Sequence, residues 1–175
     1  IKPTAKMPSP PPPPSASSHS SSSSSISHWI RGNEIGSGSF GRVSLAINRA
    51  NGELFAVKSV ARSGCAAEEA LKNEFRILSG LDSPHVVRCL GGDQTLEDGV
   101  PTLNLFMEYM GGGNLTDMMK KFGCCPLEEP LVRVYTRGIL QGLHYLHTRG
   151  VVHCDIKGKN VLIGSSGGIK IADFG

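Results

Sequence analysis

Two groups of polar residues late in the chain contain side chains suited to phosphoryl transfer. The first is the segment 153–160 (HCDIKGKN) and the second is the segment 173–175 (DFG). Phosphoryl transfer needs a group that orients or deprotonates the attacking hydroxyl, oxygen ligands for magnesium, and a cation beside the migrating phosphate. The residues of these types are Asp155 for the hydroxyl, Asn160 and Asp173 for magnesium, and Lys157 for the phosphate. Each acid alone could be a solvated loop residue, but together they indicate a phosphoryl-transfer site.

A glycine-rich segment earlier in the chain could bind the phosphates of a nucleotide. Its glycines have the spacing G-x-G-x-x-G, and Val43 follows them. Glycine lets the backbone approach phosphate oxygens closely and donate N–H groups to them. Dinucleotide-binding folds use this spacing before a helix, whereas a strand is expected here, and a hairpin turn without a ligand is the plainer alternative. The predicted nucleotide contacts of the loop are Gly36, Ser37, Gly38, Ser39, Phe40 and Gly41.

A lysine inside an apolar strand supports the nucleotide-binding interpretation. Lys58 lies in the run 55–60 (FAVKSV), where an ammonium group without a partner would be costly to bury. The phosphates held by the glycine loop are one partner. Glu74 is a second, because its helical spacing places it near the apolar stripe that faces the strands. Glu68 and Glu69 lie nearer the expected exposed start of that helix and are poorer candidates.

Hydrophobic periodicity predicts a β-rich first part that would position the loop and the lysine. Apolar, β-branched segments predict strands at 29–35, 43–47, 54–60, 86–90 and 103–107. A polar loop containing Asp98-Gly99 is expected between the last two strands. The i, i+4, i+7 spacing of Leu71, Phe75 and Leu78 predicts a helix.

A mainly helical second part would position the two polar groups. Asn114 followed by Asp117 is typical of a helix N-cap, and a longer helix is expected from Pro130 to about residue 149. Two short strands are expected at 161–163 and 169–171. The whole pattern predicts an α+β fold with two lobes.

Composition limits the other classes of function. The 175 residues carry a net charge of +3, spread along the chain, so no nucleic-acid partner is expected. No apolar run is long enough for a membrane span or a secretory signal. The five cysteines lack C-x-x-C spacing, which favours free thiols in a reducing compartment. We therefore expect a cytoplasmic protein, with the nucleus as an additional location.

Residues 1–28 differ from the rest of the chain. They contain five consecutive prolines and six consecutive serines, with almost no apolar side chains to bury. Such a composition predicts a disordered tail. Its prolines could dock on an SH3- or WW-type groove, although a solvated tail without a dedicated partner is the favoured alternative.

From residue 29 onward the chain resembles the protein kinase superfamily. The resemblance rests on G-x-G-x-x-G-x-V at 36–43, A-V-K at 56–58, the helix glutamate Glu74, H-x-D-x-K-x-x-N at 153–160 and D-F-G at 173–175. Asp155-x-Lys157 resembles the Ser/Thr branch. Finer segments resemble mitogen-activated protein kinase kinase kinases, especially those of plants. These segments are WIRG at 29–32, FAVKSV at 55–60, SPHVV at 83–87, MEYMGGG at 107–113 and HCDIKG at 153–158.

The resemblance implies a bilobal kinase fold that uses ATP and Mg²⁺ on a protein substrate, such as a downstream kinase. It implies an N-lobe at 29–107, a hinge at 108–113 and the first part of a C-lobe at 114–175. It also implies roles for Lys58, Glu74, Asp155 and Lys157 in catalysis. The implied adenine contacts are Ile35, Val43, Ala56, Leu162, the gatekeeper Met107, and Glu108 and Met110 of the hinge. The implied stack between the lobes consists of Leu78, Cys89, His153 and Phe174, which makes His153 structural.

Two features depart from the family pattern. Cys154 occupies the position of the commoner arginine, which often pairs with a phosphate on the activation loop. Switching by such a phosphate is therefore in doubt for this chain. The sequence also stops at the DFG motif, so we expect the 175-residue chain alone to have little kinase activity. The alternative function is a kinase-fold fragment that binds nucleotide or partners without catalysis.

Overall fold

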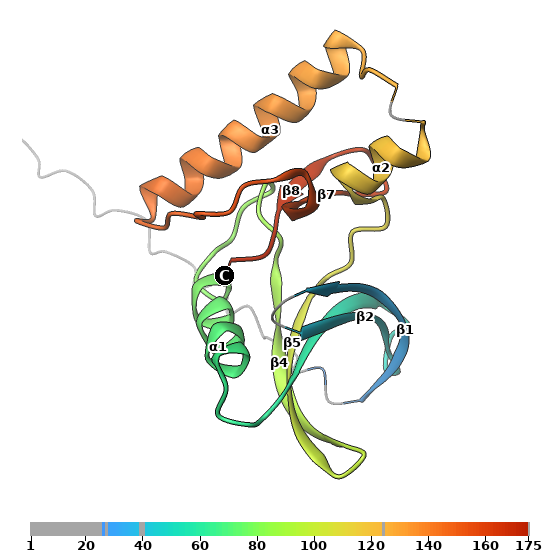
Figure 1. Cartoon of the computed structure of the whole chain (residues 1–175), viewed down its shortest axis with the longest axis vertical. Helices are drawn as coiled ribbons and strands as arrows, with labels where there is room; N and C mark the ends of the chain where they lie inside the picture. The colour runs from blue at the N-terminus through green and yellow to red at the C-terminus, as the bar shows by residue number, and fades with distance from the viewer. Residues whose placement is uncertain (1–25, 27, 39–40, 124, 175) are drawn as a thin grey trace, which may run out of the picture.

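The chain forms a larger antiparallel sheet with one helix beside it, followed by a mainly helical part with a small second sheet (Figure 1). The computed structural model describes residues 26, 28–38, 41–123 and 125–174. The larger sheet has the order β1-β2-β3-β5-β4. Its strands are β1 (Trp29–Gly38), β2 (Gly41–Asn48), β3 (Leu54–Ala61), β4 (Cys89–Glu97) and β5 (Val100–Glu108), and the helix is α1 (Ala66–Leu78). The predicted two-lobe α+β fold is confirmed.

The second part packs a long helix on a three-stranded sheet. Its elements are β6 (Gly113–Asn114), α2 (Leu115–Lys121), α3 (Glu129–Thr148), a 3-10 turn at Gly158–Asn160, β7 (Val161–Ile163) and β8 (Ile169–Ile171). Figure 1 shows α3 at the end of the molecule away from the larger sheet. Gly142 lets α3 approach β8, because a Cβ there would lie 2.8 Å from Cδ1 of Ile171 and 2.9 Å from the carbonyl oxygen of His85.

Strand β3 is central in the larger sheet, and both of its faces are buried. Phe55 and Val57 point to one face, where Phe55 packs edge-on against Trp29 and Phe106. The alternate residues Ala56, Lys58 and Val60 point to the other face, toward α1 and the second part. The period of two in a strand therefore separates an aromatic core from the face that carries Lys58.

The predicted strand at 86–90 and the polar loop after it were wrong in extent. Val86 makes only an isolated bridge to Ile171, and β4 begins at Cys89. Most of the expected loop is strand, since β4 and β5 form a hairpin that turns at Asp98-Gly99. Two polar side chains of the expected loop, Asp93 and Thr95, accept hydrogen bonds from Asn104 of β5 on one face of this hairpin. Because polar residues occupy every second position here, the sequence alone did not indicate a strand.

The helix α1 confirms the predicted placement of Glu74 and corrects that of Glu68. Leu71, Glu74 and Leu78 are buried, whereas Phe75 is 40% exposed and lies off the buried stripe. Glu68 was expected near an exposed helix start, but it is buried. Its carboxylate accepts hydrogen bonds from the backbone N–H groups of residues 63 and 64 and pairs with Lys72. These bonds hold the pKa of Glu68 at about 2, with the Lys72 bond as the largest cause.

The helices of the second part begin where the sequence predicts. The Asn114 side chain accepts a hydrogen bond of 2.8 Å from the backbone N–H of Asp117, so the predicted N-cap is confirmed. The first turn of α3 contains Pro130, as expected. The residues Val134 and Leu140 on α3 are 59% and 60% exposed.

Within the described part of the chain, no helix is both long and apolar enough to cross a membrane. The predicted tail lies outside the described residues except for Ile26 and His28, and Ile26 packs partly against the aromatic core. The predicted loop contacts Ser39 and Phe40 also lie outside them, as does Gly175.

Candidate active site

Lys58 joins the larger sheet to α1 and to the segment after β8. Its Nζ lies 2.6 Å from Oε2 of Glu74 and 2.6 Å from Oδ1 of Asp173. The Lys58 side chain is 8% exposed and the Glu74 side chain 2% exposed, while the Asp173 side chain is 45% exposed. The predicted pairing of Lys58 with Glu74 is confirmed. Its pairing with Asp173 was not predicted, because these residues are joined only by the packing of the two lobes.

The two carboxylates keep the Lys58 side chain in its charged form despite its burial. Burial lowers the pKa of the Lys58 ammonium, but the carboxylates of Glu74 and Asp173 outweigh burial and raise that pKa. Burial is also the largest influence on Glu74 and raises the pKa of its carboxyl, against the attraction of Lys58. Lys58 therefore stays cationic at neutral pH and can attract the phosphates of a nucleotide.

The segment between α3 and β7 brings the first group of polar residues together. The Lys157 Nζ donates a hydrogen bond of 2.6 Å to Oδ2 of Asp155. The Asn160 Nδ2 donates to the Asp155 backbone oxygen at 2.9 Å and to Oδ2 at 3.2 Å. The Lys157 bond is the largest cause of a lowered pKa for Asp155. Asp155 is therefore ionised at neutral pH, as a group that orients a hydroxyl must be.

The DFG segment is held against this loop by backbone and ring contacts. The Ala172 N–H donates to the Asn160 carbonyl oxygen at 2.9 Å, and a ring nitrogen of His153 lies 3.0 Å from the Ala172 carbonyl oxygen. The His153 and Phe174 rings pack with centroids 4.8 Å apart. Both side chains are buried at 3% exposure. These contacts support the predicted structural role of His153.

The backbone is strained at two positions in this region. Cys154 has φ 65° and Asp173 has φ 68°, values that residues other than glycine rarely adopt. Such strain persists where surrounding contacts determine the conformation, and it is commonest at functional sites. Here the contacts of His153 and Ala172 on either side supply that support.

The ends of the glycine loop lie at the tips of β1 and β2, where Gly38 pairs with Gly41. Gly41 has φ 130°, and a Cβ there would lie 2.5 Å from the carbonyl oxygen of Ser59. Only glycine therefore fits this position, where β2 begins against β3. The register places Val43 opposite Lys58, so the strand that follows the loop lies beside the Lys58 strand.

Five of the predicted adenine contacts belong to one apolar cluster. Its buried members from this set are Ala56, Met107 and Met110, and Val43 and Leu162 pack against them. The cluster also contains Leu78 and Phe174 of the implied stack between the lobes, and Cys89 packs against it. Ile35 is the exception among the apolar contacts of this set, because its side chain is 46% exposed and lies outside the cluster.

The side chain of Glu108 has contacts that the sequence did not indicate. The prediction concerned its backbone. Its Oε1 lies 2.6 Å from Nζ of Lys170 on β8 and accepts a hydrogen bond of 2.7 Å from the Arg88 N–H. The ion pair thus connects the end of β5 to the small sheet.

Asn160 and Asp173 fit a shared magnesium ion by their chemistry. Among the described residues, no cluster of three or more His, Cys, Asp or Glu side chains could hold a metal alone. The Asn160 nitrogen is used by Asp155, so its amide oxygen is the atom able to bind a cation. Two protein oxygens are too few for an all-protein magnesium cage, but they suit an ion whose other ligands are phosphate oxygens and water.

In the full-length protein, replacing Cys154 by Ser should leave phosphotransfer nearly unchanged. The Cys154 side chain is exposed, and its Sγ donates a hydrogen bond of 3.7 Å to the Val152 carbonyl oxygen. A serine hydroxyl can make the same contact. We expect kcat and KM for ATP within about twofold of the wild type, a range typical of a conservative surface change. A large fall in kcat, measured by transfer of labelled phosphate, would contradict this prediction.

Comparisons with known proteins agree with the geometry of the site. The family described as the protein kinase domain matches residues 29–175. The relatives include a mitogen-activated protein kinase kinase kinase, MST11, of Pyricularia oryzae, which is 44% identical over 85% of this chain and 17% of its own length. Mitogen-activated protein kinase kinase kinases 20 and 17 of Arabidopsis thaliana are 43% and 45% identical over 84% of this chain. The chain spans 44% and 39% of the lengths of these two proteins.

Proposed function

Because the chain belongs to the protein kinase domain family, we propose that it binds ATP with Mg²⁺ and takes part in phosphoryl transfer to a serine or threonine hydroxyl of a protein. The observation that carries this proposal is the contact of Lys58 with both Glu74 and Asp173. Through this contact the buried ammonium of Lys58, on the same sheet as the glycine loop, reaches Asp173, a proposed magnesium ligand.

The roles of the site residues follow from their positions. The glycine loop and Lys58 bind the phosphates, and Glu74 holds Lys58 in place. Magnesium, when bound by Asn160 and Asp173, neutralises charge on the phosphates. Asp155 accepts a hydrogen bond from the substrate hydroxyl and orients it. Lys157, 2.6 Å from Asp155, lies where it can also stabilise charge on the transferred group.

The apolar cluster around Ala56, Met107 and Met110 provides the surface for the adenine ring. A nucleotide pocket is mostly apolar, with a few polar groups that fix orientation. Backbone groups of the segment 108–110 supply those polar groups in this proposal. Binding adenine there would place the phosphates toward Lys58, since Ala56 and Lys58 lie on the same face of β3.

The proposed substrate is a downstream kinase. The relatives from Pyricularia oryzae and Arabidopsis thaliana are named as mitogen-activated protein kinase kinase kinases. A protein of that class phosphorylates a mitogen-activated protein kinase kinase. An inactive kinase of that second class is therefore the substrate to test first, with dephosphorylated casein as a general Ser/Thr acceptor.

Replacing Asp173 by Asn should remove the dependence of nucleotide binding on magnesium. The change keeps the size of the side chain but removes the negative charge that a divalent cation requires. We expect calorimetric titration to show that Mg²⁺ strengthens ATP binding to the wild type but not to Asp173→Asn. In the full-length protein, phosphotransfer by the variant should fall at least about a hundredfold, as for loss of one preorganised electrostatic contact.

The matched control is Asp82→Asn, a change of an exposed aspartate in the loop after α1. This control should behave as the wild type in both assays. If the wild type bound no ATP in the presence of Mg²⁺, or if Asp173→Asn kept its magnesium response, the proposed function would be wrong.

A further inference from the structure

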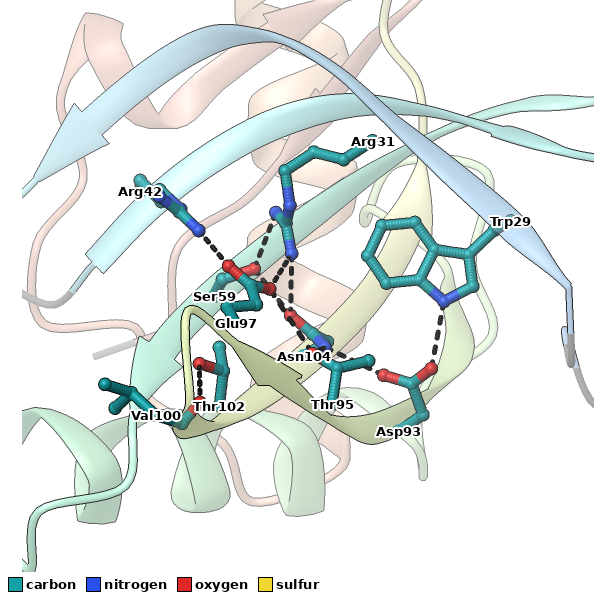
Figure 2. Close-up of polar contacts among 10 residues, drawn as sticks. All are labelled: Trp29, Arg31, Arg42, Ser59, Asp93, Thr95, Glu97, Val100, Thr102 and Asn104. Carbon is teal, nitrogen blue, oxygen red and sulfur yellow. Dashed lines mark hydrogen bonds and ion pairs between the residues drawn. The ribbon is translucent and has the colours of Figure 1, made fainter.

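A network of polar side chains lies on the larger sheet beside Trp29 (Figure 2). It is on the face of the sheet that carries Phe55 and Val57, opposite the face that carries Lys58. All five strands contribute to it. Its members are Trp29 and Arg31 of β1, Arg42 of β2, Ser59 of β3, Asp93, Thr95 and Glu97 of β4, and Asn104 of β5. We call this set the sheet network. None of its members was a predicted site residue.

Glu97 is the point where two arginines of the glycine-loop hairpin meet. Its Oε1 pairs with Arg31 of β1, and its Oε2 pairs with Arg42 of β2. The two carboxylate oxygens thus bind two different strands. Figure 2 shows the Glu97 side chain between the two guanidinium groups. The side chains of Glu97 and Arg31 are 22% and 21% exposed, whereas that of Arg42 is 49% exposed.

A buried asparagine stabilises the β4–β5 hairpin that carries Glu97. Asn104 is 5% exposed, and its Nδ2 donates to Asp93 at 2.8 Å and to Thr95 at 2.9 Å. Its Oδ1 accepts from Ser59 at 2.6 Å and from Arg31 at 3.1 Å. All donors and acceptors of this amide are therefore used, which restricts the β4–β5 hairpin and the Arg31 side chain to one arrangement.

The network connects the two opposite edges of the sheet. In the order β1-β2-β3-β5-β4, the strands β1 and β4 are the edge strands and, over their described residues, are not paired with each other. Side chains join them instead, through Arg31 with Glu97 and through the Trp29 indole N–H, which donates to Asp93 at 2.9 Å. The Arg31 guanidinium also lies 5.0 Å from the centre of the Trp29 ring. The β1–β2 hairpin is thereby attached to β4 through Trp29, Arg31 and Arg42.

The attachment acts at the end of the hairpin that carries the glycine loop. Arg42 follows Gly41 directly, and Gly41 pairs with Gly38 at the other end of the loop. A fixed Arg42 therefore limits how far this end of β2 can move from β3 and β4. A loop that binds phosphates through backbone N–H groups depends on such placement, because a displacement of about 1 Å weakens these bonds steeply.

We propose that Glu97 is a positioning residue for nucleotide binding, because its ion pairs with Arg31 and Arg42 hold the glycine-loop hairpin in register above the phosphates. This inference rests on the proposed binding of ATP. It assigns Glu97 an effect on the phosphate part of the nucleotide alone, since the apolar cluster for adenine lies on the other face of the sheet and does not include the network.

The test compares ligands with and without phosphates. We expect Glu97→Ala and Arg42→Ala each to weaken the binding of Mg²⁺-ATP about threefold to tenfold, the range for loss of one charge-assisted contact between partly exposed groups. Adenosine binding should not change. In the Glu97→Ala/Arg42→Ala double variant, the loss should be smaller than the product of the two single losses, because both changes break the same pair.

Two further variants make the result specific. Arg49→Ala removes an exposed arginine from the turn after β2, outside the network, and should bind ATP as the wild type does. Glu97→Gln keeps the size of the side chain but removes its charge, so it should weaken ATP binding as Glu97→Ala does. It replaces Glu97→Ala in the test if that variant does not fold. Thermal unfolding of each variant shows whether it is folded at the titration temperature.

Each outcome has a distinct meaning. Wild-type ATP affinity in folded Glu97→Gln, or equal weakening of ATP and adenosine binding, would overturn the positioning role and leave the proposed function intact. Absence of ATP binding by the wild type would overturn both. Selective loss of affinity for the phosphate-containing ligand, with coupling between residues 42 and 97, would establish the inference.

Discussion

In the full-length protein, replacing Lys58 by Met should abolish phosphotransfer and lower stability at the same time. The ammonium group is the cation that the structure places between Glu74 and Asp173, at 2.6 Å from each carboxylate. Methionine has a similar length but no charge, so the phosphates and Asp173 lose their common partner. We expect phosphotransfer to fall at least about a hundredfold, as for other preorganised electrostatic contacts. Transfer of labelled phosphate to an inactive downstream kinase measures this loss.

The loss of stability in Lys58→Met has a separate cause and can be reversed. Glu74 is 2% exposed, and without Lys58 its carboxylate would be buried without a cation. We expect the free energy of unfolding to fall by about 1–3 kcal/mol, the cost of leaving a buried polar group unsatisfied. Burial already raises the pKa of Glu74. Removal of Lys58 raises it further, so the destabilisation should be largest at high pH, where this carboxyl must ionise, and smaller at low pH.

A double variant separates the two effects. Lys58→Met/Glu74→Gln removes both charges, so its stability should recover toward that of the wild type while its activity stays lost. Denaturant unfolding of the three proteins measures the recovery. Activity in either variant comparable to the wild type would contradict the role of Lys58. Failure of the double variant to regain stability would contradict the explanation through Glu74.

In the full-length protein, replacing Asp155 by Asn should lower kcat while ATP affinity and stability stay near the wild-type values. The Asp155 side chain is 53% exposed, so its charge contributes little to folding. Its carboxylate is held by Lys157 and Asn160 in a position to accept a hydrogen bond from a substrate hydroxyl. An asparagine can turn its N–H₂ toward the hydroxyl and cannot accept a proton. We expect kcat to fall about 10²- to 10⁴-fold.

The pH dependence of kcat offers a second measurement on Asp155. The Lys157 hydrogen bond is the main cause of its lowered pKa, so the carboxylate is ionised well below neutral pH. The wild-type rate should therefore show no loss from Asp155 protonation between about pH 6 and 8, a range well above the ordinary aspartate pKa. Asp82→Asn again serves as the matched control. A variant that lost ATP affinity as strongly as kcat would contradict an orienting role.

The sequence determined those parts of the protein that depend on local spacing. Alternation and helical periodicity are properties of short segments, so most strands, α1, the Asn114 cap and the start of α3 were predictable. The residues of the site were also identifiable, because each motif carries its chemical types at short range. The pairing of Lys58 with Glu74 could be predicted from one helix face and one strand.

The tertiary structure alone decided which distant polar groups meet. The extent of β4 and β5 was missed, because alternating polar residues are ambiguous until a partner face is known. Glu68 was misplaced because its burial depends on how the loop before α1 turns back over it.

Contacts between segments far apart along the chain have no local signal. The pairs Lys58–Asp173, Glu108–Lys170 and Arg31–Glu97 each join residues more than 60 positions apart. Backbone packing of the two lobes and closure of the sheet bring these charges together, and the sequence order does not record either. The sequence therefore determined the chemistry of the candidate site, and the tertiary structure determined how that chemistry is held in position.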